Sequence, residues 1–294
     1  MTPEDLQKQI QETSPWIQSV RDEMAQVLVG QSQLVDRLLI GLLCNGHILL
    51  EGVPGLAKTL AVKALSGSLS TSFSRFQFTP DLLPADLVGT MVYHPQITKF
   101  EPKLGPIFNN LILADEINRA PAKVQSALLE AMQERQVTIG EHTYPLPKPF
   151  LVMATQNPIE QEGTYVLPEA QADRFMFCLN TTYPSRSDEE RVVRETTGTS
   201  QPIITPVITG PELIEAQKLV RSVPVSDEVI AYAVRLVSRT RPETPEAPSY
   251  IREFVRWGAS PRASQFLVLG AKANALPWPV HSHVNPMCWW LTRR

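Results

Sequence analysis

Two clusters of polar residues in this 294-residue chain have the types and spacing that nucleotide phosphoryl chemistry needs. A glycine-rich loop, residues 52–59, lies between an apolar run and an expected helix, and the acids Asp115 and Glu116 follow a second apolar run. Backbone N–H groups in such a loop and at a helix N-terminus bind phosphate oxygens. The pattern therefore predicts a phosphate-binding loop that faces a pair of acids.

Each charged or hydroxyl side chain in the two clusters has an expected role. Lys58 would neutralise charge on the β and γ phosphates, and the Thr59 hydroxyl would ligate Mg²⁺. Asp115, at the end of a strand, would hold the same Mg²⁺, usually through water, and Glu116 would orient and deprotonate the attacking water. The residues of the loop expected to bind nucleotide are Gly52, Val53, Pro54, Gly55, Leu56, Ala57, Lys58, Thr59 and Leu60.

The loop departs from the usual Gly-Lys-Ser/Thr ending because Ala57 occupies the glycine position. We expect its methyl to be tolerated if Ala57 has right-handed helical angles, since only a positive φ demands glycine. Taken alone, the loop could be a turn between a strand and a helix, and Asp115–Glu116 could be a solvated helix cap. Their spacing, and the apolar residues before Asp115, favour a site at the end of a buried parallel strand.

Composition limits the classes to which the chain can belong. The sequence is 43% hydrophobic, enough for a sizeable core, and its net charge of −3 gives no support for a nucleic-acid-binding surface. The cysteines, Cys44, Cys178 and Cys288, are odd in number and far apart, which suits a reducing compartment. Without an apolar leader or a run long enough for a membrane span, we expect a cytoplasmic protein.

Strands and helices alternate through residues 1–200. This alternation predicts an α/β fold whose mainly parallel sheet is covered on both faces, with ligands bound beyond the carboxyl ends of the strands. Strands are expected at residues 47–50, 73–78, 111–115, 150–156 and 176–179. Helices are expected from the cap Thr2 to about residue 28 with a break at Pro15, and at residues 33–44, 58–69, 121–134 and 169–174.

Two irregular stretches interrupt this alternation. Residues 87–108 place glycines and prolines around short β-like runs, and residues 136–146 have the pattern of a hairpin with a turn at Gly140–Glu141. From about residue 198 the chain is rich in Pro and Thr, and three helices are expected, at residues 211–220, 227–240 and 261–275. We therefore expect an α/β core over residues 1–200 and a small helical domain over residues 201–294.

Seven segments taken together resemble a known family. They are Leu28–Gln31, Gly52–Thr59, Phe78–Asp86, Ala114–Ala120, Ala154–Pro158, Leu167–Phe175 and Gly258–Ala263. Over about residues 26–275 the chain resembles the AAA+ ATPases and, within them, the MoxR family. The resemblance implies a P-loop AAA+ core with a mainly parallel five-stranded sheet, followed by a small all-α lid domain. The irregular stretches would then be the helix-2 insert and the pre-sensor hairpin, which project toward a central pore in relatives.

The resemblance implies further nucleotide contacts from this chain. Gly30 and Gln31 would lie near the adenine. Asn157 would be sensor 1, an amide that orients the attacking water and reports on the γ-phosphate without titrating. On the sequence alone, Asn157–Pro158 could equally be a turn.

Three arginines have roles that the resemblance implies. Arg174 would be an arginine finger that reaches the neighbouring subunit's nucleotide, although by itself it could pair with Asp173 at the surface. Arg262 would be sensor 2, in the first turn of a helix that Ser260 caps. Arg119, beside Glu116, could bridge subunits, orient the switch, or lie at a solvated helix start.

The function implied is Mg²⁺-dependent ATP hydrolysis by a ring-forming homo-oligomer, a hexamer. MoxR relatives act as chaperone-like factors in complex maturation or metal-cofactor insertion, on a protein client and often with a von Willebrand factor A-domain partner. Two alternatives stay open: a magnesium-chelatase-type motor subunit, which the segment Ala114–Ala120 disfavours, and a nucleotide-binding assembly module with weak hydrolysis. A monomeric P-loop kinase would need neither Arg174 nor the lid motif.

The tail after Ala275 departs from the family's pattern. It holds three of the five tryptophans and two of the five histidines, and Pro277 should end the preceding helix. We expect either a frameshifted or altered gene end, which would weaken the lid and the subunit contacts, or a divergent lid ending packed by its tryptophans. His281, His283 and Cys288 lack the fourth ligand of a zinc site.

Overall fold

The computed structural model describes residues 3–53, 55–96, 98–157, 164–198 and 202–276. The chain divides into two compact units, the larger over residues 19–214 and the smaller over residues 215–294 together with 1–18. The expected division into domains at residue 200 stays a prediction. Thr2, Pro54, Pro158 and the tail after Leu276, for which we made predictions above, lie outside the described residues.

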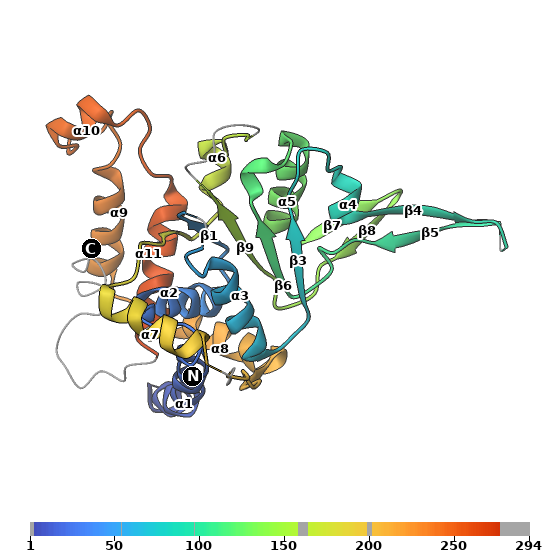
Figure 1. Cartoon of the computed structure of the whole chain (residues 1–294). Helices are drawn as coiled ribbons and strands as arrows, with labels where there is room; N and C mark the ends of the chain where they lie inside the picture. Colours follow the sequence, from blue (N-terminus) through green and yellow to red (C-terminus); the bar gives the residue numbers. More distant parts are fainter. Residues whose placement is uncertain (1–2, 54, 97, 158–163, 199–201, 277–294) are drawn as a thin grey trace. The chain divides into compact units, whose positions relative to one another are not determined.

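A five-stranded parallel sheet forms the centre of the larger unit (Figure 1). In spatial order its strands are β10 (Phe177–Asn180), β1 (Ile48–Glu51), β9 (Leu151–Gln156), β6 (Leu111–Asp115) and β3 (Phe73–Gln77). The predicted α/β fold with a five-stranded parallel sheet is confirmed, with the ends of several strands shifted by about one residue. Because all strands run the same way, the ends of β1, β6 and β9 meet at one edge, where Glu51 pairs with Gln156.

Helices cover the sheet because its central strands are apolar on both faces. All residues of β6 are buried, as a strand inside a parallel sheet requires. One face packs against α5 (Ala122–Glu134), whose apolar side joins strand residues in a single core cluster. Elsewhere α3 (Lys58–Gly67) contacts β6, and α2 (Ser32–Leu43) contacts β10.

The first irregular stretch forms a long two-stranded ribbon. It consists of β4 (Gly89–His94) and β5 (Lys99–Leu104), and it projects away from the sheet beyond α4 (Pro84–Val88) (Figure 1). At its base the backbones lie so close that a Cβ on Gly89 would lie 2.3 Å from the Lys103 carbonyl oxygen, and one on Gly105 would lie 2.2 Å from that of Leu87.

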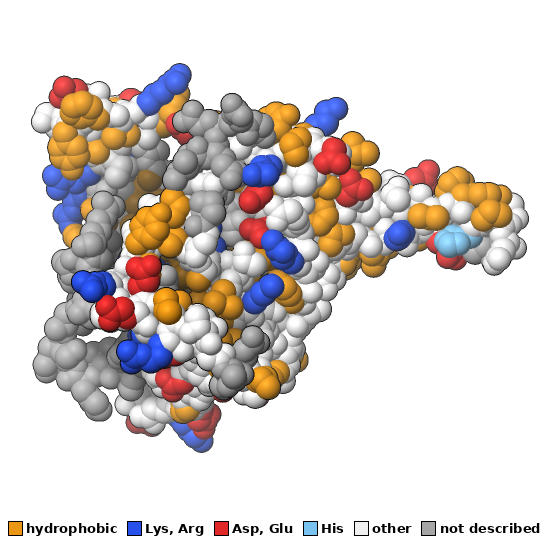
Figure 2. All heavy atoms as spheres, viewed as in Figure 1, with side chains coloured by type: hydrophobic (Ala, Val, Ile, Leu, Met, Phe, Trp, Pro, Cys, Tyr) orange, Lys and Arg blue, Asp and Glu red, His pale blue; other side chains and the backbone are white. Residues whose placement is uncertain are grey.

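Apolar side chains are exposed along this ribbon, as Figure 2 shows for its projecting part. Tyr93 and Phe100 pack on each other across the strands with ring centroids 5.1 Å apart, yet Phe100 remains 64% exposed. The second stretch is the expected hairpin, β7 (Gln136–Ile139) with β8 (His142–Pro145), and β7 contacts β4.

The remaining elements complete the two units. The larger unit also contains β2 (Leu69–Ser70) paired with β11 (Ile208–Thr209), the 3₁₀-helix Ile117–Arg119, α6 (Glu169–Ala172) and α7 (Arg186–Thr196). The smaller unit contains α9 (Asp227–Ser238), α10 (Ser249–Phe254) and α11 (Pro261–Asn274), while α1 (Pro3–Ala25) and α8 (Gly210–Ser222) cross the division. Helices α9 and α11 pack through the small buried residues Ala233 and Ala271. No described helix is long and apolar enough to cross a bilayer.

One helix prediction was wrong, and two exposed helices were missed. Helix α1 is not broken at Pro15 and ends at Ala25. Helices α7 and α10 were not predicted, because neither buries any side chain and neither therefore shows a clear apolar stripe. For α7 a signal was present, since Ser185 caps the helix by accepting a hydrogen bond from the Asp188 N–H, and acids follow in the first turn.

Candidate nucleotide site

The glycine-rich loop lies between β1 and α3, as the sequence predicted. Gly52 has φ +146°, and a Cβ there would lie 2.1 Å from Oγ1 of Thr181, so no larger residue fits without displacing that side chain. Gly55 has φ +84° with open space around it. Helix α3 begins at Lys58, so the N–H groups of its first turn lie at the loop, where an anion binds best.

Ala57 does not have the right-handed angles under which we expected its methyl to be tolerated. Its φ is +56° and its ψ is +16°, the left-handed region, immediately before the first turn of α3. An alanine there costs about 1–2 kcal/mol relative to right-handed geometry. Ala57 thus has the left-handed backbone conformation that glycine usually adopts at this position, and the loop is strained at that point.

Lys58 connects the glycine-rich loop to the end of β9 through hydrogen bonds. Its ammonium group donates to the Gly52 carbonyl at 2.5 Å and to the Gln156 carbonyl, at the end of β9, at 3.3 Å. The side chain of Gln156 in turn donates to the Glu51 carboxylate at the end of β1. The cation expected to meet phosphate therefore lies between the ends of two parallel strands.

Asp115 is the most densely hydrogen-bonded acid at this edge. Its Oδ1 accepts from the Thr155 hydroxyl at 2.5 Å. Its Oδ2 accepts from the Thr59 hydroxyl at 3.4 Å and from Nε and Nη2 of Arg75 at 3.0 and 2.7 Å. The structure therefore brings together Thr59 and Asp115, which were predicted to share a metal ion, and it adds Arg75, which sequence analysis missed.

Glu116 is held by three neighbours. Its Oε2 accepts from Nε2 of Gln77 at 2.8 Å and lies 3.0 Å from Nε of Arg119. Its backbone N–H donates to the Thr155 hydroxyl at 2.9 Å, and its own φ of +57° places it in the left-handed region. Strain of this kind concentrates at functional sites. Of the three roles open for Arg119, the ion pair favours orientation of Glu116.

The sequence holds one signal for Arg75 and Gln77, although that signal is not sufficient by itself. They alternate on β3, and strand residues two apart lie on one face. In the register of the sheet Gln77 pairs with Asp115, so the face of β3 that carries them borders the two acids. Predicting this needed the pairing of β3 with β6, which the strand pattern alone does not give.

Asn157 follows β9 and is buried, with 5% of its surface exposed. Its carbonyl accepts a 3.3 Å hydrogen bond from the Asn118 side chain. It comes directly after Gln156, whose carbonyl accepts from Lys58, so the expected sensor lies at the same sheet edge as the loop. Its role as sensor 1 stays a prediction.

The two remaining predicted arginines lie in different units. Arg174 is half-buried after α6, and its Nη1 donates to the Leu129 carbonyl of α5 at 2.5 Å. Arg262 belongs to the smaller unit, where Ser260 caps α11 as predicted and accepts from the Arg262 N–H at 3.1 Å. Neither role is tested by these contacts.

The segment expected near the adenine packs against the start of α7. Gly30 has φ +71°, and a Cβ there would lie 2.4 Å from Cγ of Asp188. Gln31, next to it, is half-buried, whereas Leu60 in the first turn of α3 is 42% exposed. Glycine at position 30 is thus required both by the backbone angle and by the approach of α7.

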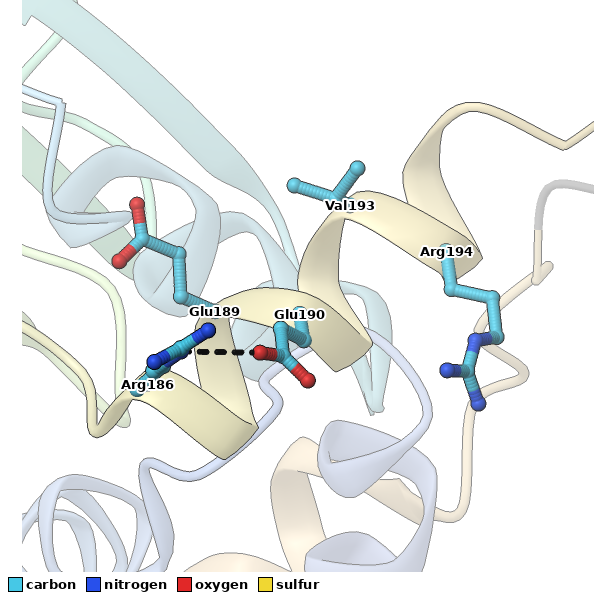
Figure 3. A pocket seen from close by; sticks show the side chains of 5 residues that line it. All are labelled: Arg186, Glu189, Glu190, Val193 and Arg194. Carbon is cyan, nitrogen blue, oxygen red and sulfur yellow. Dashed lines mark hydrogen bonds and ion pairs between the residues drawn. The ribbon is translucent and has the colours of Figure 1, made fainter.

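A hollow on the surface of α7 has no part in this site. Its lining residues, Arg186, Glu189, Glu190, Val193 and Arg194, all come from that one helix (Figure 3). Arg186 pairs with Glu190 at 3.1 Å across one turn, and both side chains are more than half exposed. Nothing there is arranged to hold a phosphate or a metal ion.

The donors at Asp115 fit magnesium better than a softer metal. A carboxylate and a hydroxyl are the oxygen ligands that Mg²⁺ takes from a protein when phosphates and waters supply the others. Among the described residues, no group of three or more His, Cys, Asp or Glu side chains is arranged so that it could hold a metal ion. Burial and the Glu51 carboxylate raise the pKa of the Cys178 thiol to about 12, so this thiol stays protonated at neutral pH.

Comparisons with known proteins agree with this geometry. Residues 47–177 match the ATPase family associated with various cellular activities (AAA). Chaperone MoxR1 of Mycobacterium tuberculosis is 50% identical over 86% of this chain and 67% of its own length. The protein YeaC of Bacillus subtilis, which is uncharacterised, is 46% identical over 89% of this chain and 79% of its own.

The chain belongs to the MoxR family of AAA+ ATPases. A crystal structure of a candidate ATPase from Cytophaga hutchinsonii superimposes with a TM-score of 0.85 at 47% identity, covering 93% of this chain and 83% of that one. The MoxR resemblance predicted from the sequence motifs is therefore confirmed, and so is the AAA+ fold.

Proposed function

We propose that this MoxR-family chain hydrolyses ATP with Mg²⁺ as a homo-oligomeric ring, a hexamer, and works in the cytoplasm as a chaperone-like factor. The observation that supports it most directly is the hydrogen bond from Thr59, next to Lys58 at the start of α3, to Asp115, the residue before Glu116 at the end of β6. Only this combination supplies a phosphate cradle and a base within one site.

The side chains have separate tasks in this proposal. Lys58 and the loop N–H groups bind the β and γ phosphates, while Thr59 and Asp115 would hold the metal ion. A magnesium ion there would neutralise charge on the phosphate oxygens. Glu116 accepts the proton of the attacking water, Asn157 orients that water, and Arg174 of a neighbouring copy and Arg262 bind the γ-phosphate.

The cellular role extends this proposal beyond the site. Hydrolysis would move the lid and, through the core, the ribbon of β4 and β5, whose exposed Tyr93 and Phe100 suit contact with a protein client. We propose complex maturation or metal-cofactor insertion as the task, with a von Willebrand factor A-domain partner. The relation to Chaperone MoxR1 supports a chaperone-like role.

Two variants and the removal of magnesium test the enzymatic part in an ATPase assay. Lys58→Ala should lose ATP binding measured by calorimetry, because the phosphates lose their counter-ion. Glu116→Gln should bind ATP but not turn it over, since an amide cannot accept the proton. Chelation of magnesium should abolish turnover in the unchanged chain. Turnover that survives Glu116→Gln would remove Glu116 from the role of base.

The same assay separates this proposal from a nucleotide-binding assembly module with weak hydrolysis. A module would bind ATP and oligomerise without steady-state turnover, and Glu116→Gln would then change nothing. Sedimentation with and without ATP reports the oligomeric state. Ring formation together with turnover would support the ATPase.

A further inference from the structure

The ion pair between Arg75 and Asp115 occupies the carboxylate oxygen that the proposed metal ion needs. Arg75 donates to Oδ2 through two nitrogens, Nε at 3.0 Å and Nη2 at 2.7 Å. The Thr59 hydroxyl reaches the same oxygen at 3.4 Å. A carboxylate oxygen has about two lone-pair positions. With Arg75 in place, Oδ2 has no position left for a metal ion or for a metal-bound water.

The other oxygen of Asp115 is partly engaged as well. Oδ1 accepts the Thr155 hydroxyl at 2.5 Å, and the same Thr155 oxygen accepts the backbone N–H of Glu116. Turning the carboxylate would break the hydrogen bond from Thr155, the residue that also accepts the Glu116 N–H. Asp115 is also buried, with 7% of its surface exposed, so a charged carboxylate without a cation would be costly there.

Arg75 is placed so that it can leave. Its side chain is 46% exposed, whereas that of Asp115 is 10% exposed. The guanidinium group would therefore regain solvent when it is displaced, and Asp115 would exchange one cation for another. Arg75 also donates to Oε1 of Gln77, the residue that holds Glu116, so its departure frees a contact of that residue as well.

We propose that Arg75 is a displaceable counter-ion that competes with Mg²⁺ for Asp115 and so sets the magnesium concentration at which this chain takes up nucleotide. This inference rests on the proposed function, because it assumes that Asp115 helps to hold the metal ion. Arg75 is a positioning residue in this account, since it acts through Asp115 and contacts no substrate.

Binding without turnover tests the proposal. A fluorescent, non-hydrolysable ATP analogue is added at a subsaturating concentration in chelator, and magnesium is titrated in. Arg75→Met keeps the length of the side chain but removes the charge and both hydrogen bonds. We expect its half-saturating magnesium concentration to fall about three- to tenfold below that of the unchanged chain. Arg75→Gln should shift it in the same direction, which guards against poor folding of the methionine variant.

Two control variants separate competition from other effects. Arg21 pairs with Asp36 at 2.8 Å in the same unit and is also partly buried, so Arg21→Met reports the general effect of breaking an Arg–Asp pair. Arg119→Met removes a cation that pairs with Glu116, so it reports the effect of losing a positive charge and an ion pair elsewhere in the site. Competition predicts a clearly larger shift for Arg75→Met than for either control.

The outcomes distinguish this inference from the proposed function. If Asp115→Asn abolishes the magnesium dependence while Arg75→Met titrates like the unchanged chain, the inference is wrong and the metal site stands. A half-saturating concentration that rises in Arg75→Met would also overturn it, because Arg75 would then prepare Asp115 for the metal. If Asp115→Asn leaves the dependence unchanged, the proposed metal site fails, and the inference fails with it.

Discussion

The side-chain amide of Gln77, the last residue of β3, donates a 2.8 Å hydrogen bond to Oε2 of Glu116. Arg119 lies 3.0 Å from the same oxygen, so one face of the carboxylate is engaged by two donors of its own chain. A base whose lone pairs are already occupied accepts a proton from water less readily. Gln77 therefore restrains the residue proposed to activate water.

Removing this restraint should speed turnover. We expect Gln77→Ala to raise kcat about two- to fivefold with little change in KM, because one hydrogen bond is worth about 1 kcal/mol. Steady-state kinetics measures it, with Gln133→Ala on the exposed side of α5 as the control. A lower kcat would mean instead that Gln77 holds Glu116 in its working position.

The strain at Ala57 predicts a stabilising substitution to glycine. Ala57→Gly should raise the free energy of unfolding by about 0.5–1 kcal/mol, because glycine accepts the left-handed φ without a steric cost. Ala64→Gly, at a buried position inside the same helix, should lower it by about 1 kcal/mol or more. Urea unfolding of both variants compares them, and equal signs for the two changes would contradict the argument.

The buried ring of His47 predicts a loss of stability in acid. Its Nδ1 accepts from the Val152 N–H at 2.9 Å, its Nε2 lies 3.2 Å from the Met132 carbonyl, and burial together with the Arg135 charge lowers its pKa to about 3. In the unfolded chain His47 binds a proton near pH 6.5, whereas in the folded chain it binds one only near pH 3. This histidine therefore removes stability as the pH falls through that window, by about 2 kcal/mol at pH 5.

A matched pair of variants isolates that effect. His47→Gln should be less stable than the unchanged chain at pH 7.5, but its free energy of unfolding should fall less between pH 7.5 and pH 5. His142→Gln, at an exposed position in β8, should keep the slope of the unchanged chain. Identical slopes for all three proteins would show that His47 is not the group responsible.

Arg174 should act across a subunit boundary. Arg174→Ala should bind ATP normally and hydrolyse it about 10³-fold more slowly, as the loss of an arginine finger does. Mixing it with Glu116→Gln protein should restore part of the activity, since some interfaces then join an intact base to an intact finger. Sedimentation of differently tagged subunits first verifies exchange. No recovery at any mixing ratio would leave Arg174 with its contact to Leu129 as its only role.

The sequence predicted the fold where periodicity and burial agree. The three central strands, β1, β6 and β9, are mostly apolar runs, and burial on both faces makes such a run recognisable without a partner. The edge strands β3 and β10 mix polar and apolar residues. The loop and Asp115–Glu116 were predictable for the same reason, because each follows a strand. Helix α7 was missed because it is charged on every side and depends on its Ser185 cap rather than on an apolar face.

Contacts between strands were beyond the sequence pattern. Arg75 and Gln77 matter only because β3 lies beside β6, and Thr155 matters only because β9 lies on the other side of β6. The left-handed angle of Ala57 was not predicted, for a related reason. The local preference of alanine favours right-handed geometry, and the course of the whole loop from β1 to α3 overrides it.

The ribbon of β4 and β5 is attached to the rest of the larger unit at one end only. A force on its far part, where Tyr93 and Phe100 pack on each other, acts at the base of the ribbon, where the backbones at Gly89 and Gly105 lie in close contact. This contact joins backbone to backbone, and no side chain that could change its rotamer lies between Gly105 and the Leu87 carbonyl. A displacement of the ribbon should therefore move α4 directly. A bulkier residue at either glycine would force the two strands apart at their base.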